Sequence, residues 1–271
     1  MIAPVVVSVG AATHTGLRRR LNEDSFLAQA PLFLVADGMG GHQAGDVASA
    51  AVIDVFRPLA GRAVLTVDDV GFAVARARSA VEAIAGDGAS RAGTTLSGVA
   101  ITAVDGVGYW LAVNIGDSRT YRLAEGLLEQ ISVDHSVVQE LIDAGELLSD
   151  DAQRDRRRNI ITRALGAGSD GEADYWMIPA EPGDRLLVCS DGLSSEVPDA
   201  LIHAVLRRSE DAQAAADRLI ALALERGGRD NVTAIVIDAV HVSARALGAA
   251  DDESDIDSDT RPRAGATGGV R

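Results

Sequence analysis

Acidic residues stand directly at the ends of apolar, strand-like runs in four separate parts of the chain. The four positions are Asp37 after residues 32–36, Asp117 after residues 111–116, Asp191 after residues 186–190 and Asp230 before residues 232–236. An ionised carboxylate beside a buried strand is costly unless it is paired or bound to a cation. Oxygen ligands suit Mg²⁺ or Mn²⁺ better than zinc. The pattern therefore favours a hard-cation site assembled from distant segments.

Each of these acids also has an ordinary interpretation, because Asp-Gly is a common turn and Asp a common cap. Asp87-Gly88 and Asp105-Gly106 are interpreted only as turns. The hypothesis of a cation site rests on the joint pattern and not on any one acid.

Alternating apolar and turn-forming segments from residue 4 to residue 240 predict the elements that carry these acids. Strands are predicted over residues 5–9, 32–36, 96–104, 107–113, 185–188 and 232–240. Helices are predicted over residues 44–59, 68–85, 136–144, 200–207 and 211–225, where apolar residues lie three and four apart. Residues 94–131 are predicted to form four successive strands with short turns, which favours antiparallel pairing and an α+β fold.

Residues 1–241 are interpreted as one domain and residues 242–271 as a tail. Residues 251–271 hold six acids against three arginines, and Asp, Ser, Gly, Arg and Pro dominate the tail. Such a composition buries too little apolar surface to offset the entropy of ordering. We therefore expect a disordered, acidic tail.

Composition excludes several classes of function. The formal net charge of −15 argues against nucleic acid as a partner, because a phosphate backbone requires a basic face. All 25 basic residues are arginine, which excludes a Schiff-base lysine and a phosphate-loop lysine. Cys189 is the only cysteine, so no disulfide within the chain is expected. No apolar run approaches the roughly 20 residues that cross a bilayer, and the N-terminus has no signal pattern; we expect a cytoplasmic protein with no membrane partner.

Eight ordered motifs give the chain a specific resemblance. They are residues 19–25 (RRLNEDS), 36–42 (ADGMGGH), 93–95 (GTT), 114–119 (NIGDSR), 134–136 (DHS), 161–166 (ITRALG), 187–193 (LVCSDGL) and 229–233 (RDNVT). In their order and spacing, over about residues 5–240, the chain resembles the bacterial metal-dependent protein phosphatases, the type 2C serine/threonine phosphatase family. The resemblance implies an α-β-β-α sandwich of two packed antiparallel sheets flanked by helices, with residues 1–241 as the phosphatase catalytic domain.

The resemblance also implies a site with two Mn²⁺ or Mg²⁺ ions and a weaker third. Its implied ligands are Asp37 bridging two ions, the Gly38 carbonyl on one of them, Asp191 and Asp230 on the first ion, Glu23 on the second with Asp24 supporting it, and Asp117 with Asp191 on the third. Glycine suits a carbonyl ligand because it lacks a Cβ and lets the backbone approach an ion. The implied reaction is hydrolysis of phosphoserine and phosphothreonine by a metal-activated water.

The phosphate-binding arginine implied by the resemblance is Arg19, four residues before Glu23. Its planar guanidinium suits a bidentate phosphate contact. Because Arg18 and Arg20 flank it, either neighbour remains an alternative. With Asp37 and Asp117, Arg19 completes the predicted catalytic set, and the implied partners are phosphorylated proteins, including Ser/Thr kinases, acted on by a monomer.

His42 and one basic run keep more than one interpretation. Met39 occupies the position where eukaryotic members carry a histidine, and His42 is either a general acid or a structural residue. His135 is interpreted as structural. The arginines of residues 154–158, at the end of a segment that corresponds to a variable flap, either contact acidic substrates or form a solvated charged surface.

Two other classes of phosphatase do not fit the same residues. A cysteine phosphatase needs an arginine six residues after its nucleophile, but that position after Cys189 is Ser195. An aspartyl-phosphate enzyme needs a second acid two residues after the first, and that position after Asp37 is Met39. A catalytically inactive pseudophosphatase acting as a binding module remains the alternative, as does a phosphatase of the same fold acting on anti-anti-sigma proteins.

Overall fold

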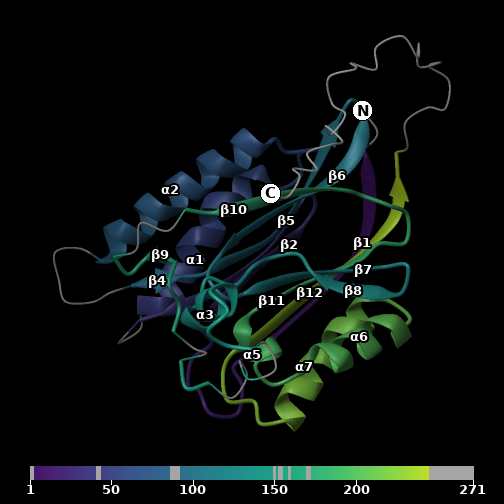
Figure 1. Ribbon diagram of the computed structural model, residues 1–271. Helices are drawn as coiled ribbons and strands as arrows, with labels where there is room; N and C mark the ends of the chain where they lie inside the picture. The colour runs from purple at the N-terminus through teal and green to yellow at the C-terminus, as the bar shows by residue number, and fades with distance from the viewer. Residues whose placement is uncertain are drawn as a thin grey trace, which may run out of the picture.

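Two antiparallel sheets stack face to face in the centre of the molecule (Figure 1). The computed structural model describes residues 3–40, 44–85, 92–148, 151, 155–157, 160–168 and 172–243 of the 271-residue chain. One sheet has the order β1 (Val5–His14), β12 (Val232–Val242), β11 (Arg185–Cys189), β7 (Arg119–Ala124) and β8 (Leu127–Gln130). The other has the order β10 (Asp174–Pro179), β6 (Val107–Ile115), β5 (Leu96–Val104), β3 (Leu32–Met39), β4 (Gly93–Thr94) and β9 (Leu165–Gly166), with β2 (Asp24–Gln29) paired to β3.

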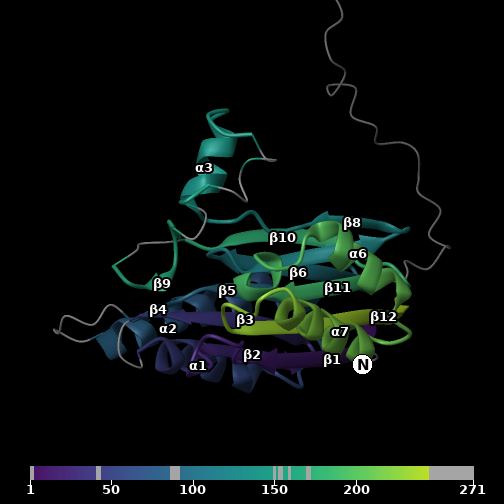
Figure 2. The ribbon, with the colours of Figure 1, turned by 90° about the horizontal axis from the view of Figure 1, so that it is seen from below.

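Helices cover the outer face of each sheet, which gives four layers (Figures 1 and 2). The sheet that contains β3 is covered by α1 (Ala44–Phe56), the 3₁₀ turn η1 (Arg57–Leu59) and α2 (Val67–Ala85). The sheet that contains β12 is covered by α5 (Asp191–Ser194), α6 (Asp199–Arg208) and α7 (Ala212–Glu225). A further helix, α3 (Val137–Asp143), projects away from the layers (Figure 2). The predicted α+β sandwich is confirmed.

Three apolar clusters hold the layers together, one under each helical layer and one between the sheets. The central cluster includes Phe33, Trp110 and Ile235, each fully buried. Burying one such side chain stabilises the fold by about 1.5–3 kcal/mol. The Trp110 indole also donates from Nε1 to Asp184 Oδ2 at 2.9 Å. A core poor in aromatic residues is thus built mainly from aliphatic side chains, with buried polar contacts such as Trp110–Asp184 and Ser97–Thr120 among them.

The predicted elements are found with differences at their ends, the largest in β1, which continues to His14 rather than ending at residue 9. The helix expected over residues 44–59 changes to a 3₁₀ turn at Arg57 because Pro58 cannot donate to the α-helical ladder. The strands β2 and β10 were not predicted. The sequence of β2 mixes polar and apolar residues, and β10 is an edge strand whose residues alternate between partial burial and exposure. The elements β4, β9 and α5 have two to four residues, too few for a recognisable period.

The acidic strand ends meet at one end of the sandwich. Asp24 pairs with Asp37 in the antiparallel register of β2 and β3. The last residue of β11, Cys189, pairs near the start of β12 with Ala234. Because antiparallel neighbours bring the end of one strand beside the start of the next, residues far apart in the chain share this edge. Among the helices of the described residues, none is long and apolar enough to span a bilayer.

Candidate metal centre

The backbone around Asp37 is fixed by the neighbouring strands. The Asp37 amide donates to Thr95 Oγ1 at 3.0 Å, and the Thr95 amide donates to the Asp37 carbonyl at 2.9 Å. The next amide, that of Gly38, donates to the Glu23 carbonyl at 3.1 Å. Asp37 and Glu23 are therefore held in register by backbone bonds that do not involve their carboxylates.

Two glycines create the close approach between β3 and the start of α1. A Cβ on Gly38 would overlap the Gly45 carbonyl oxygen, so only glycine fits at position 38. A Cβ on Gly45 would lie 2.6 Å from Glu23 Oε1 and 3.0 Å from the Gly38 carbonyl oxygen. The Glu23 carboxylate and the Gly38 carbonyl therefore flank one point on the surface of α1, and both are suitable oxygen donors for a hard cation.

Asp191 and Asp230 approach this point from the other sheet. Asp191 is the first residue of α5, and a Cβ on the following Gly192 would overlap the Asn231 carbonyl oxygen. Asn231 in turn accepts the Glu23 amide at Oδ1, at 2.8 Å, and donates from Nδ2 to the carbonyls of Thr15 and Leu21. One asparagine side chain thus ties the loop before β12 to the segment that carries Glu23.

Burial and mutual repulsion raise the pKa values of the acids at this site. Burial, followed by repulsion from Asp24, Asp191, Asp117 and Asp230, raises the pKa of Asp37 well above its ordinary value. Burial and the Asp230 charge raise the pKa of Asp191 to about 6, although a contact with the Asp37 carboxyl group partly opposes the shift. The five carboxyl groups therefore share one electrostatic environment.

The pKa values of Asp117 and Asp24, two of these five acids, are raised in the same way. Burial and the charge of Asp191 raise the pKa of Asp117 well above its usual range. Burial raises the pKa of Asp24 to about 7, although hydrogen bonds from Thr233 and Ser190 oppose the shift, at 2.7 and 2.8 Å to Asp24 Oδ2. Cations at this edge of the sandwich would relieve the repulsion in every case.

Arg19 is the arginine of its run that reaches the acids. Its Nη2 lies 2.7 Å from Asp230 Oδ2, and its Nη1 lies 4.0 Å from Glu23 Oε2. The hydrogen bond to Asp230 raises the pKa of Arg19. Its side chain remains 48% exposed, so the guanidinium stands at the surface above the carboxylates. Arg18 and Arg20 are exposed and make no ion pair within the described part of the chain.

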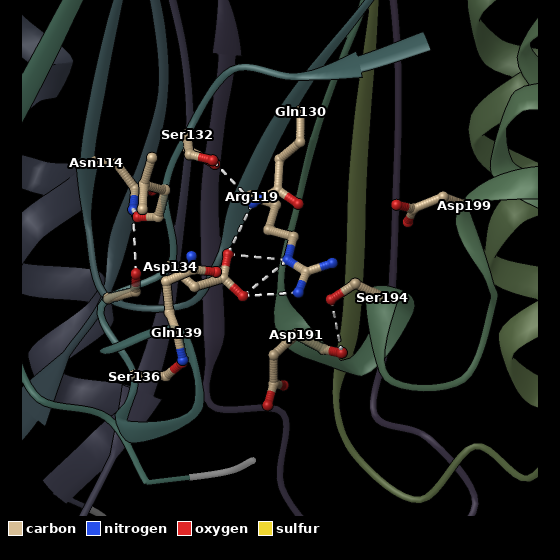
Figure 3. Close-up of polar contacts among 12 residues, drawn as sticks. Asn114, Arg119, Gln130, Ser132, Asp134, Ser136, Gln139, Asp191, Ser194 and Asp199 are labelled. Carbon is tan, nitrogen blue, oxygen red and sulfur yellow. Dashed lines mark hydrogen bonds and ion pairs between the residues drawn. The ribbon is translucent and has the colours of Figure 1, made fainter. Parts of the chain in front are cut away.

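A second arginine, Arg119, points toward Asp134 beside the acidic centre (Figure 3). Arg119 donates from Nε and Nη2 to the Asp134 carboxylate at 2.7–3.0 Å and from Nη1 to the Tyr121 hydroxyl at 3.0 Å. Burial alone would lower the pKa of Arg119, but Tyr121 and Asp134 raise it well above its ordinary value. Its charge also lowers the pKa of Asp191 and of Asp117. Arg119 is therefore a fixed, partly buried positive charge beside the acidic centre.

His135 joins the loop before Asp117 to the base of the segment that carries α3. Its Nδ1 accepts the Gly116 amide at 3.2 Å, and its Nε2 lies 2.9 Å from Asp174 Oδ2. The Gly116 carbonyl accepts the His135 amide at 2.9 Å, and the His135 carbonyl accepts the Thr162 amide at 2.9 Å. These contacts agree with a structural interpretation of His135. His42 and most of residues 149–159, including Arg154 and Arg158, lie outside the described residues.

Two carboxylate oxygens at this edge are buried without a hydrogen-bond partner in the described structure, Asp24 Oδ1 and Asp117 Oδ1. An unpartnered buried carboxylate oxygen is costly, and a cation is one group that would satisfy it. Across the described ranges, no three His, Cys, Asp or Glu side chains already surround a single point closely enough to hold an ion. The donors fit hard cations in chemistry and in charge, and binding would require the side chains to draw together.

The structure brings together all of the predicted site residues and adds others that lie within the quoted motifs but had been given no role in the site. The predicted set gathered at one end of the sandwich is Arg19, Glu23, Asp37, Gly38, Asp117, Asp191 and Asp230. The additional residues are Thr95, Arg119, Asp134 and Asn231. Arg119 has one signal in the sequence, because an arginine at the start of a buried strand requires an acidic partner.

Comparison with known proteins places the chain among phosphatases. A family model described as Protein phosphatase 2C matches residues 18–226. The serine/threonine protein phosphatase PstP of Mycobacterium tuberculosis is 42% identical over 242 residues, which cover 87% of this chain and 46% of PstP. This chain therefore spans about half of that relative.

Two further matches cover nearly the whole of the protein compared. The serine/threonine phosphatase stp of Listeria innocua is 34% identical over 241 residues, covering 83% of this chain and 93% of stp. The crystal structure of the PstP catalytic domain in complex with two manganese ions has a TM-score of 0.77 and 38% identity, and the match covers 88% of this chain and 100% of that one. The chain belongs to the Protein phosphatase 2C family.

Proposed function

We propose that this protein is a serine/threonine protein phosphatase that hydrolyses phosphoserine and phosphothreonine with two Mn²⁺ or Mg²⁺ ions. The observation that carries the proposal is the convergence of carboxyl groups with raised pKa values around Asp37, directly below the exposed Arg19. Carboxylates that repel one another in a shared environment favour a multiply charged cation. The manganese ions in the related PstP catalytic domain support the same choice of metal.

Each carboxylate has a role in this proposal. Asp37, Asp191 and Asp230 would hold one ion, and Asp37 would also be a ligand of a second. Glu23 and the Gly38 carbonyl would hold the second ion, because they flank one point beside Gly45.

Asp117, whose Oδ1 has no partner among the described residues, would hold a weaker third ion together with Asp191. When bound, the ions supply Lewis acidity that activates water and neutralises phosphoryl charge.

Arg19 is proposed to orient the phosphate. Its guanidinium is held by Asp230 at 2.7 Å and is 48% exposed, so it can exchange this contact for a substrate anion. A guanidinium and a phosphate form paired, charge-assisted hydrogen bonds, which fix the orientation of the phosphoryl group as well as binding it. Removing Arg19 should therefore weaken substrate binding and misplace the reacting phosphorus.

The substrates are proposed to be phosphorylated proteins, including Ser/Thr protein kinases, and the enzyme is proposed to act as a monomer in the cytoplasm. The names of the related bacterial Ser/Thr phosphatases support this substrate class. Every predicted ligand position retains its oxygen donor in this sequence, which argues against a pseudophosphatase.

Activity on an aryl phosphate and on a phosphothreonine peptide tests the proposal. We expect hydrolysis with Mn²⁺ or Mg²⁺ and none with excess chelator. Asp37→Asn should lower kcat by at least about 100-fold, because it removes the bridging charge from the ions. Asp217→Asn, on the exposed face of α7, is the matched control. Activity that persists in chelator, or in Asp37→Asn, would disprove the metal mechanism, and inactivity of the wild type with every cation would favour the pseudophosphatase.

A further inference from the structure

A polar hollow lies beside the acidic centre, at the end of α5. Its volume is about 160 Å³, and its lining residues are Ser194, Ser195, Glu196, Pro198, Arg226 and Arg229. A space of this size would hold about five waters at about 30 Å³ each, or a group the size of a phosphate. Asp191 begins the same helix, α5, and Arg229 immediately precedes Asp230. The hollow and the proposed metal site therefore share two chain segments.

A buried carboxylate fixes one of the two arginines in this hollow. Arg229 donates from Nε to Glu196 Oε1 at 2.8 Å and from Nη2 to Oε2 at 2.7 Å, and its amide donates to Oε1 at 3.2 Å. The Glu196 side chain is 2% exposed, whereas that of Arg229 is 63% exposed. Both carboxylate oxygens are thus occupied, and the guanidinium is presented to solvent in a fixed orientation with Nη1 unpaired among the described residues.

The second arginine adds a charge that has no counterion within the described structure. Arg226 donates from Nε to the Glu196 carbonyl at 2.6 Å, and its two Nη atoms have no hydrogen-bond partner there. The exposed Ser195 supplies a hydroxyl group at the rim. Two guanidinium groups against one carboxylate leave a net positive charge in the hollow, on a protein whose formal net charge is −15. Guanidinium groups only donate hydrogen bonds, so their ligand must be an acceptor.

We propose that this hollow binds a second anionic group on the polypeptide substrate, either an acidic side chain or a second phosphate. The inference rests on the proposed phosphatase function. The four residues of α5 span about 6 Å at 1.5 Å each. An extended peptide advances about 3.3 Å per residue, so an anion about two residues from the phosphothreonine would reach the hollow. The hollow would then select among phosphoproteins by the charge beside the phosphorylated residue.

A series of phosphothreonine peptides tests this selection. The reference peptide carries no other charge within four residues of the phosphothreonine. In the others a single Asp is moved from three residues before it to three residues after it, and a final peptide carries a non-hydrolysable phosphonate at the best position. We expect kcat/KM to be about fivefold to tenfold higher at the best position, mainly through KM, which is the scale of one partly exposed, charge-assisted contact.

Variants of the hollow identify the residue responsible. Arg226→Gln should reduce the preference to about twofold or less, because it removes the charge that has no counterion. Ser195→Asp places a negative charge in the hollow and should reverse the preference. The matched control is Arg76→Gln, which removes an exposed arginine from α2 on the opposite face of the sandwich and should leave the preference intact. Circular dichroism verifies that each variant is folded.

Two outcomes would overturn the proposed selection while the phosphatase function stands. In one, the wild type hydrolyses the reference peptide but prefers an acid at none of the positions tested. In the other, Arg226→Gln keeps the full preference. If the wild type hydrolyses neither peptides nor aryl phosphate with Mn²⁺ or Mg²⁺, the phosphatase function fails, and the selection fails with it. A larger gain from the phosphonate than from Asp at the same position would identify a second phosphate, rather than a carboxylate, as the preferred ligand.

Discussion

Replacing Asp191 by asparagine is expected to stabilise the protein at pH 8 when divalent cations have been removed. Burial and the nearby Asp230 raise the pKa of Asp191 from 3.8 to about 6. An acid whose pKa is higher in the folded state contributes stability that is complete below its unfolded pKa and lost as the pH rises through the folded pKa. For Asp191 this loss falls between about pH 4 and pH 6. At pH 8 the ionised carboxylate therefore opposes folding, and asparagine removes that charge.

The size of the effect follows from the two pKa values. The difference between 3.8 and about 6 corresponds to about 3 kcal/mol, at 1.36 kcal/mol for each pKa unit. Solvent screening at a half-buried position reduces this figure to about 2 kcal/mol. For a domain of this size, 1 kcal/mol shifts the melting temperature by about 2–4 °C, so Asp191→Asn should melt about 4–8 °C higher.

Thermal unfolding followed by circular dichroism measures the shift in chelator at pH 8 and at pH 4.5. The advantage of Asp191→Asn should shrink at pH 4.5, where the folded wild type already carries the proton. Added Mn²⁺ at pH 8 should reverse the order, because only the wild type keeps the full ligand set. Asp217→Asn, an exposed position on α7, should show neither effect. A metal-free Asp191→Asn protein that melts below the wild type at pH 8 would refute the proposed repulsion.

Two further substitutions separate substrate binding from stability. Arg19→Gln should raise KM for a phosphopeptide about tenfold, because it removes a charge-assisted contact to phosphate. Arg18→Gln is the control, and equal effects of the two substitutions on KM would contradict the assignment of Arg19. Asp184→Ala should cost about 3 kcal/mol in denaturant unfolding because Arg122 loses its buried partner. Its kcat per folded molecule should be unchanged, since Asp184 lies at the end of β11 opposite Asp191; a lower kcat would contradict this placement.

Local signals in the sequence were sufficient for much of the fold. Asp105-Gly106 was predicted to be a turn, and it joins β5 to β6 as a two-residue turn. The φ angles of these two residues are 51° and 81°. The same angles recur at Glu125-Gly126 between β7 and β8. Positive φ at both central residues of a hairpin turn favours a polar residue followed by glycine, as in Asp-Gly. The strand β2 was missed because what stabilises it is its pairing with β3, which no local pattern records.

Some of the site residues could likewise be predicted from local sequence patterns, and others could not. The pattern of acids at strand ends was enough to predict Asp37, Asp117, Asp191 and Asp230 as one group. Glu23 and Arg19 carry no such signal and were assigned only through the resemblance to a family. The partners of Asn231 lie more than 200 residues away in the chain, and Arg119 meets Asp134 only through the pairing that places β7. Contacts set by tertiary register leave no short-range trace in the sequence.

The most direct test of the proposed dinuclear centre is a crystal structure of the protein grown with Mn²⁺, with anomalous diffraction used to locate the metal. Two strong peaks are expected, one bounded by Asp37, Asp191 and Asp230 and the other by Asp37, Glu23 and the Gly38 carbonyl. Crystals of Asp37→Asn grown in the same way should lose at least one of them. If wild-type crystals show no peak among these oxygens while Mn²⁺ supports hydrolysis, the ions act elsewhere and the proposed centre is wrong.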